Sequence, residues 1–226
     1  MLATSFTSLL EEAALGGAEK RYSGNIADRL DVLFSQDHLE QLESHFDCFG
    51  ILAFDPVADR AIVDYLNAGT LPSDSGPRLL VIWSSSESAP APLPLDSLDW
   101  IDIERRDLVA QELIRQLFAP KPPPALPGIA FVQRISGGDE PIYFPLMNMA
   151  DEKQIRSFLR RVFEIVNAAP LDDGKAFVNH LAYKAELARM NFRRAGASSS
   201  KQWLLRTLRF AKEHASDLIS AISLAV

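Results

Sequence analysis

Cysteine is nearly absent from this sequence, which has Cys48 alone among 226 residues. One cysteine excludes an internal disulfide, a C-x-x-C redox pair and a zinc centre built from several thiolates. Because a cysteine without a partner behaves as a small hydrophobic residue, we expect Cys48 to be buried in the core. Low cysteine use is also typical of a reducing compartment, so the predicted location is cytoplasmic.

Long apolar runs are missing too. The longest uninterrupted stretches are short, such as residues 79–83, whereas a membrane-spanning helix needs about 20 apolar residues. Residues 1–14 contain Glu11 and Glu12 and no lysine or arginine, which differs from the basic start of a secretory signal. We therefore expect neither a membrane span nor a membrane partner.

The common signatures of catalysis and cofactor binding are missing as well. The eleven glycines match neither G-x-G-x-x-G nor G-x-x-x-x-G-K-[ST], and there is no G-x-S-x-G or H-E-x-x-H. The four histidines are scattered along the chain. We predict no catalytic residue, no cofactor and no metal, and we favour a protein that is not an enzyme.

The sequence does contain an uneven distribution of charge. Residues 1–150 hold 22 acidic and 10 basic side chains, whereas residues 151–226 hold 8 acidic and 13 basic ones, within a net charge of −7. The basic C-terminal third is either a solvated face that complements the acidic body, or a docking surface for an anionic partner.

The hydrophobic pattern divides the chain into three parts. Residues 1–46 are predicted to be N-terminal helices packed on the core, 47–169 an α/β core, and 170–226 a basic helical extension. In the core we expect strands at 48–54, 78–83, 128–135 and 141–147, helices at 58–67, 102–118 and 151–168, and a long loop at 84–99. The extension is expected to hold a pair of helices, at 175–193 and 202–224.

The order of these core elements is strand, helix, strand, helix, strand, strand, helix, which resembles the thioredoxin-like fold. Redox members of that fold carry C-x-x-C just after the first strand, where this sequence has Asp55-Pro56-Val57-Ala58, so disulfide exchange is excluded. Pro127 precedes the third strand, where the fold often has a cis proline. We therefore predict a thioredoxin-like mixed sheet without redox cysteines, with another mixed α/β sandwich as the alternative.

The leading functional prediction is a non-catalytic, cytoplasmic protein-interaction module, such as an adaptor or a regulatory subunit. Its partner would bind the basic C-terminal helical pair, through Arg189, Arg193, Arg194, Trp203, Arg206, Arg209 and Lys212. Apolar residues of the last helix recur at alternating intervals of four and three, the pattern of a helix packed along another helix, either within this chain or in a second copy or a partner.

Two alternatives come from other functional classes. The same cations, interleaved with aromatic residues, could bind nucleic acid through its phosphates and bases. The other alternative is an enzyme with an unrecognised site at the sheet end near Asp55 and the 84–99 loop, where α/β sheets tend to place their sites. It predicts a concave pocket containing a carboxylate of raised pKa.

Overall fold

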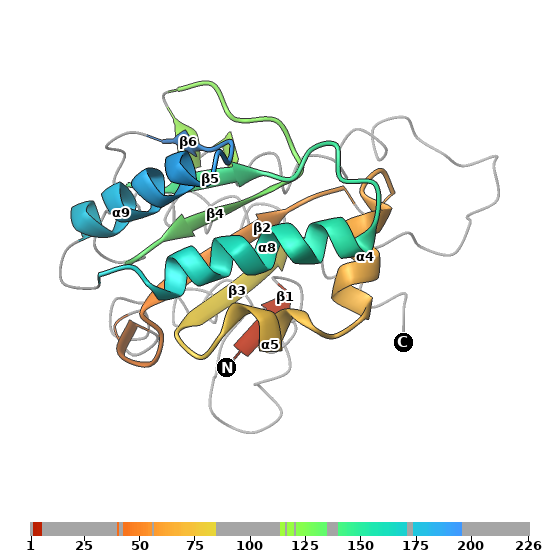
Figure 1. Ribbon diagram of the computed structural model, residues 1–226, viewed down its shortest axis with the longest axis horizontal. Helices are drawn as coiled ribbons and strands as arrows, with labels where there is room; N and C mark the ends of the chain where they lie inside the picture. The colour runs from red at the N-terminus through yellow and green to blue at the C-terminus, as the bar shows by residue number, and fades with distance from the viewer. Residues whose placement is uncertain are drawn as a thin grey trace, which may run out of the picture.

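The computed structural model describes residues 2–5, 40, 43–55, 57–84, 114–115, 117–119, 121–134, 140–170 and 174–195. They form a mixed α/β fold around one six-stranded sheet (Figure 1). The elements are β1 (Leu2–Ser5), β2 (Cys48–Ala53), α4 (Arg60–Asn67), α5 (Leu71–Ser75), β3 (Leu79–Ser84), β4 (Gly128–Val132), β5 (Ile142–Pro145), α8 (Glu152–Asn167), α9 (Gly174–Leu187) and β6 (Arg193–Arg194). None of the helices in these ranges is long and apolar enough to cross a membrane.

The strand order across the sheet is β1-β3-β2-β4-β5-β6. β2 and β3 are parallel, with Cys48 opposite Leu79 and Ala53 opposite Ser84. β4 runs antiparallel to β2, and β5 runs antiparallel to β4. The prediction of an α/β fold with a mixed sheet is therefore confirmed.

The prediction that residues 1–46 are helical is wrong for residues 2–5, which form β1 and pair in parallel with β3. Four residues are too few for a hydrophobic period to reveal a strand. Pairing with β3 decides the conformation instead, because it satisfies the backbone groups along one edge of that strand. Residues 40 and 43–45 are helical, and the remaining predicted N-terminal helices lie outside the described residues.

The predicted helix at 175–193 is also wrong at its C-terminal end, because α9 stops at Leu187. Arg189 has a φ of 53°, and the Met190 N–H donates to the Ala185 carbonyl at 2.9 Å, a geometry that ends a helix. Met190 and Ala195 are buried, so the chain turns back to the sheet and forms β6 against β5. Hydrophobic periodicity predicts further helical turns here, but burial of these apolar side chains against the sheet favours the strand instead.

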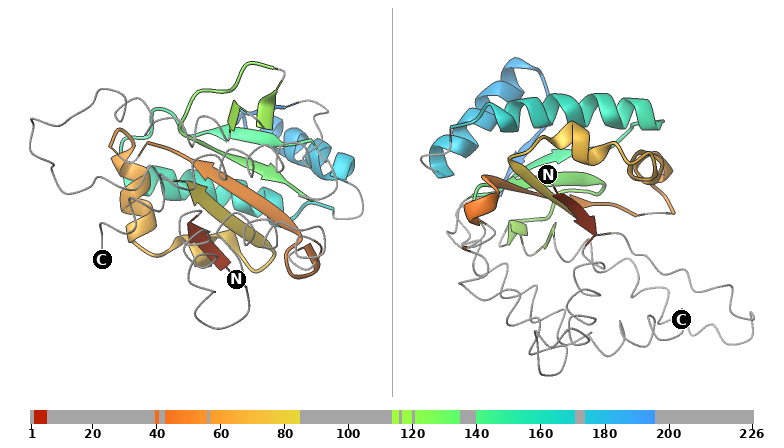
Figure 2. Two further views of the ribbon diagram at one scale, coloured as in Figure 1. Left: turned by 180° about the vertical axis from the view of Figure 1, so that it is seen from behind. Right: turned by 90° about the horizontal axis from the view of Figure 1, so that it is seen from below.

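Helices α4, α5, α8 and α9 lie on one face of the sheet, and the segment at 114–119 lies on the other (Figure 2). On the second face, the ring of Phe118 meets Tyr143 of β5 edge to face, with 5.8 Å between centroids. On the first face, Phe131 of β4 makes edge-to-face contacts with Phe144 and Phe163. Each such fully buried side chain stabilises the fold by about 1.5–3 kcal/mol.

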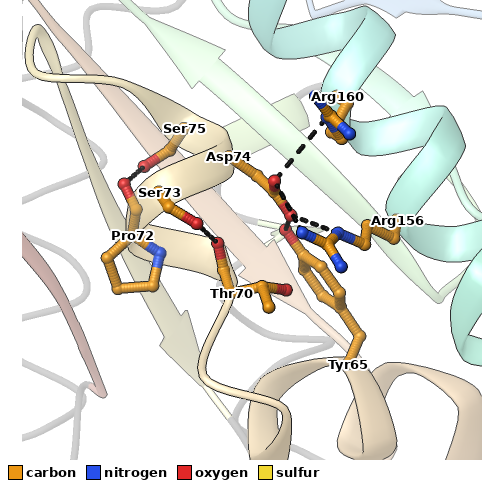
Figure 3. A network of polar contacts seen from close by, with 8 residues as sticks. All are labelled: Tyr65, Thr70, Pro72, Ser73, Asp74, Ser75, Arg156 and Arg160. Atoms are coloured by element: carbon orange, nitrogen blue, oxygen red, sulfur yellow. Dashed lines mark hydrogen bonds and ion pairs between the residues drawn. The ribbon is translucent and has the colours of Figure 1, made fainter.

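A buried carboxylate joins the helices on the first face (Figure 3). The Asp74 side chain of α5 is 5% exposed and accepts from Arg156 Nε of α8 at 3.0 Å and from the Tyr65 hydroxyl of α4 at 3.3 Å. Arg160 of α8 adds a longer ion pair, at 3.6 Å. Polar side chains from three helices are therefore committed to one structural network.

Polar bonds also close the end of the sheet where β2 and β3 begin. Arg78 donates from Nε to the Asp47 carboxylate and from Nη1 to the Asn167 carbonyl at the end of α8, the latter at 2.9 Å. The Asn167 side chain in turn donates to the Ser75 carbonyl at 2.9 Å. These polar contacts fix the end of the sheet at which β2 and β3 begin.

Candidate binding site at one end of the sheet

Three loops meet at the end of the sheet where β2 and β5 finish and β4 begins. The strand register brings them together, because Ala53 lies opposite Gly128, and Gly128 lies opposite Pro145. The loops are residues 54–59 after β2, 121–127 before β4 and 146–150 after β5. Loops carried by a rigid sheet are where binding and catalytic residues concentrate.

The first loop is ordered by two aspartates. The Asp55 carboxylate accepts from the Val57 N–H at 2.8 Å and from the Ala58 N–H at 3.2 Å, and so acts as a turn-forming side chain. The Asp55 N–H donates to Asp59 Oδ2 at 2.8 Å, while the Asp59 N–H donates to the Asp55 carbonyl at 2.7 Å. This turn leaves Val57 82% exposed although it is apolar.

The second loop is held against β5. The Leu126–Pro127 peptide bond is cis, and the Pro127 carbonyl accepts from the Leu146 N–H at 2.9 Å. The buried Tyr143 hydroxyl donates to the Ala125 carbonyl at 2.8 Å. Gly128 makes this possible, because a Cβ at that position would overlap the Tyr143 hydroxyl and ring.

A depression of about 260 Å³ lies between the loops. Its lining combines one carboxylate, from Asp59, with the ring of Pro127 and the five residues 146–150 that follow β5. Met147 is 49% exposed at this position, and Met149 is half-buried. Asn148 between them has a φ of 64°, a left-handed conformation that asparagine adopts more readily than most residues.

Burial raises the pKa of the Asp59 carboxyl, and the negative charge of Asp55 adds to the rise, while the hydrogen bond from the Asp55 backbone opposes it. Burial likewise raises the pKa of the Tyr143 phenol, and the charge of Asp59 contributes in the same direction. The depression thus places a partly desolvated carboxylate beside apolar walls. Its acidic group is Asp59, four residues after the aspartate that the sequence had singled out.

The only thiol of the chain is remote from this depression. Cys48 is the first residue of β2, at the opposite end of the strand from the 54–59 loop, and it is buried as expected. Burial raises the pKa of its thiol, so that the reactive thiolate is disfavoured. Within the described part of the chain, no group of three potential metal ligands among histidine, cysteine and carboxylate residues comes together.

The predicted C-terminal partner-binding residues fall into two groups. Arg189 and Arg193 are exposed, at the end of α9 and in β6 respectively, whereas Arg194 forms an ion pair with Glu140 at 2.7 Å. The other four, Trp203, Arg206, Arg209 and Lys212, lie outside the described residues, as do residues 85–113 and the predicted last helix. The described arginines lie on a helix end and a strand rather than on one helix face.

Sequence reasoning missed the residues that build the depression. It had placed Met147 at the end of a strand and gave Met149 and Asp59 no role. The available signal was the run Met147-Asn148-Met149, in which two large apolar residues flank a turn-forming one between a strand and a helix. Comparison with known proteins adds no family, since no family model, curated protein or solved structure matches this chain.

Proposed function

We propose that this protein is a non-catalytic interaction module with a thioredoxin-like core, and that it binds a segment of a partner protein at the sheet end formed by residues 54–59, 121–127 and 146–150. The fold assignment is supported by the order β3-β2-β4-β5, in which a parallel pair is followed by an antiparallel hairpin. The cis bond before Pro127 agrees with the same resemblance. The positions of redox cysteines are taken by Asp55 and the three residues after it.

The observation that carries the proposal is the exposure of two apolar side chains at this end of the sheet, Met147 in the lining of the depression and Val57 on the 54–59 loop. Val57 is 82% and Met147 49% exposed, on loops that backbone and side-chain hydrogen bonds hold in place. Exposed apolar groups on a pre-ordered surface bind a partner with little loss of conformational entropy. Adaptor and regulatory-subunit roles, in the cytoplasm, are both consistent with such a surface.

The basic C-terminal segment is a second contact in this proposal. Arg189 is exposed after α9 and Arg193 is exposed in β6, and three of the six cations predicted to bind a partner follow in residues 196–226. Removing 196–226 is expected to weaken partner binding while the core stays folded. Nucleic acid is the alternative partner, because the same cations could bind its phosphates. The lysate used for affinity capture is therefore divided into nuclease-treated and untreated halves.

The proposal is tested by affinity capture from the host lysate with the full-length chain. We expect a protein partner that survives nuclease, is lost with the double variant Val57→Asp/Met147→Asp, and is retained by Tyr183→Asp. Tyr183 is the matched control, because it is 58% exposed but lies on α9. A partner that both variants retain, or material released by nuclease, would overturn the assignment of this surface.

A second candidate function is favoured by the raised pKa of Asp59 in a concave site, since such carboxyls serve as general acids or bases. In that case the depression would bind a small molecule instead of a peptide. The full-length protein would be incubated with a mixture of metabolites. Turnover of one of them that is abolished by Asp59→Asn would establish that the protein is an enzyme. Turnover that survives the substitution would remove Asp59 from any reaction.

A further inference from the structure

The depression at the sheet end continues onto helix α8. A second depression, of about 430 Å³, lies along the first half of that helix, and Met149 lines both. Lys153, Ser157, Phe158 and Arg161 contribute to its lining. The two concave surfaces therefore form one path, with Asp59 near one end and the α8 cations near the other.

The cations of this path are available for a partner. Lys153 and Arg161 are exposed, and their side chains have no ion pair within the described part of the chain. Arg156 and Arg160 of the same helix differ, because both are engaged by the Asp74 carboxylate. Lys153 and Arg161 are eight residues apart, which places them about 12 Å apart along one side of the helix.

The second depression also contains one acidic residue, Asp151, which caps α8. The Asp151 carboxylate accepts from the Gln154 N–H at 2.9 Å, and the Gln154 side chain accepts from the Ala150 N–H at 3.1 Å. This reciprocal arrangement caps the N-terminus of α8. Asp151 keeps its negative charge, so Lys153 and Arg161 leave one net positive charge in the lining of this depression, whereas the charge at the sheet end is the negative charge of Asp59.

Apolar side chains join the two charged ends. Met149 is half-buried between the depressions, and Phe158 is partly buried against the core. A flexible thioether adapts to different side chains of a ligand. The surface thus offers the Asp59 carboxylate, then Met149, and then along α8 two cations with Phe158 between them.

We propose that the partner segment is a peptide of mixed charge, with a basic side chain at Asp59, apolar residues across Met149 and Phe158, and acidic side chains at Lys153 and Arg161. This inference rests on the proposed function and specifies its ligand. Charge-assisted hydrogen bonds at the two ends would fix the direction of the peptide, while the apolar middle would supply affinity. A nucleic acid fits this surface poorly, because Asp59 would face its phosphates.

The test is selection of displayed random peptides on the full-length protein, followed by fluorescence polarisation with one labelled, enriched peptide. We expect the enriched peptides to carry a basic residue at one end and, further along, two acidic residues with an apolar residue between them. Lys153→Glu/Arg161→Glu should weaken binding at least about tenfold, as should Asp59→Asn, because each removes one charged end of the site. Lys184→Glu, a charge reversal on α9, should leave the affinity unchanged.

A charge-swapped peptide completes the experiment. A peptide whose acidic residues are replaced by lysine should bind the Lys153→Glu/Arg161→Glu protein better than it binds the wild-type protein. Binding that is lost with Met147→Asp but indifferent to the α8 and Asp59 changes would overturn this inference and leave the proposed function standing. If no peptide is enriched, or binding also survives Met147→Asp, both are overturned.

Discussion

At the scale of single residues, the partial burial of Asp59 makes its negative charge unfavourable. Burial raises the pKa of Asp59 above that of the unfolded chain, so the ionised form destabilises the fold at pH values above its folded pKa. This penalty disappears as the pH falls through that folded pKa and towards 3.8, the ordinary pKa of an aspartate side chain. A residue that lowers stability at neutral pH is typical of a binding or catalytic site.

The substitution Asp59→Asn should therefore stabilise the protein at pH 7, by up to about 1 kcal/mol. Asparagine keeps an oxygen that can accept from the Asp55 N–H but carries no charge. Urea unfolding at pH 7 and near pH 4 measures the effect, and the gain should shrink at the lower pH. Asp64→Asn, at an exposed carboxylate of α4, is the control; equal gains at both positions would contradict this account.

Gly128 also shapes the site, because the absence of a Cβ lets Tyr143 pack closely against the backbone there. Gly128→Ala should destabilise the fold by about 1–3 kcal/mol, because the new Cβ would overlap Tyr143 and push the 121–127 loop away. Gly50→Ala in β2 is the comparison, since its Cβ would lie 3.2 Å from the Phe131 ring, a tight contact without overlap. Urea denaturation of both variants should give the larger loss for Gly128, and equal losses would argue against the close packing.

At the scale of elements, the Asp74 network links α5 to α8 and to α4. Arg156→Ala should lower the free energy of unfolding, because it leaves a nearly fully buried carboxylate without its closest cation. Arg160→Ala should have an effect below about 1 kcal/mol, since that side chain is 59% exposed and its ion pair is longer. Chemical denaturation compares the two variants, and similar losses would show that Arg156 has no special role.

The elements also show how far the sequence alone could predict the fold. β2 was predictable because it contains no polar side chain, and α8 because its apolar residues recur at helical spacing over sixteen residues. α5, β1 and β6 were not predicted, because each has five residues or fewer and depends on tertiary contacts. The ion pair between Arg156 and Asp74 was not predictable either, because the two residues are 82 positions apart in the sequence.

The candidate site was less predictable than the elements. Through Asp55, which follows a buried strand, the sequence indicated the end of the sheet at which the depression lies. It did not indicate that residues 54–59, 121–127 and 146–150 converge there, because that depends on the strand register of Ala53, Gly128 and Pro145. Hydrophobic periodicity reports which face a residue occupies and carries no information about which loops become neighbours.

At the scale of the whole molecule, the two ends of the sheet have different tasks. Arg78 ties the end where β2 and β3 start to the C-terminus of α8, whereas the opposite end carries the depression and its exposed apolar residues. The Arg78 contacts therefore tie down the end of the sheet that lies away from the surface on which a partner is proposed to bind.

The smallest strand has a mechanical consequence. β6 is joined to β5 by two residue pairs only, Ile142 with Arg194 and Tyr143 with Arg193, and the chain beyond residue 195 continues from it. A pulling force applied through that chain reaches the sheet along this short ladder, so β6 should peel away before the remaining strands separate. A partner that binds the C-terminal segment and pulls on it would therefore separate β6 from β5 first. The edge of β5 that pairs with β6 would then have unpaired backbone groups.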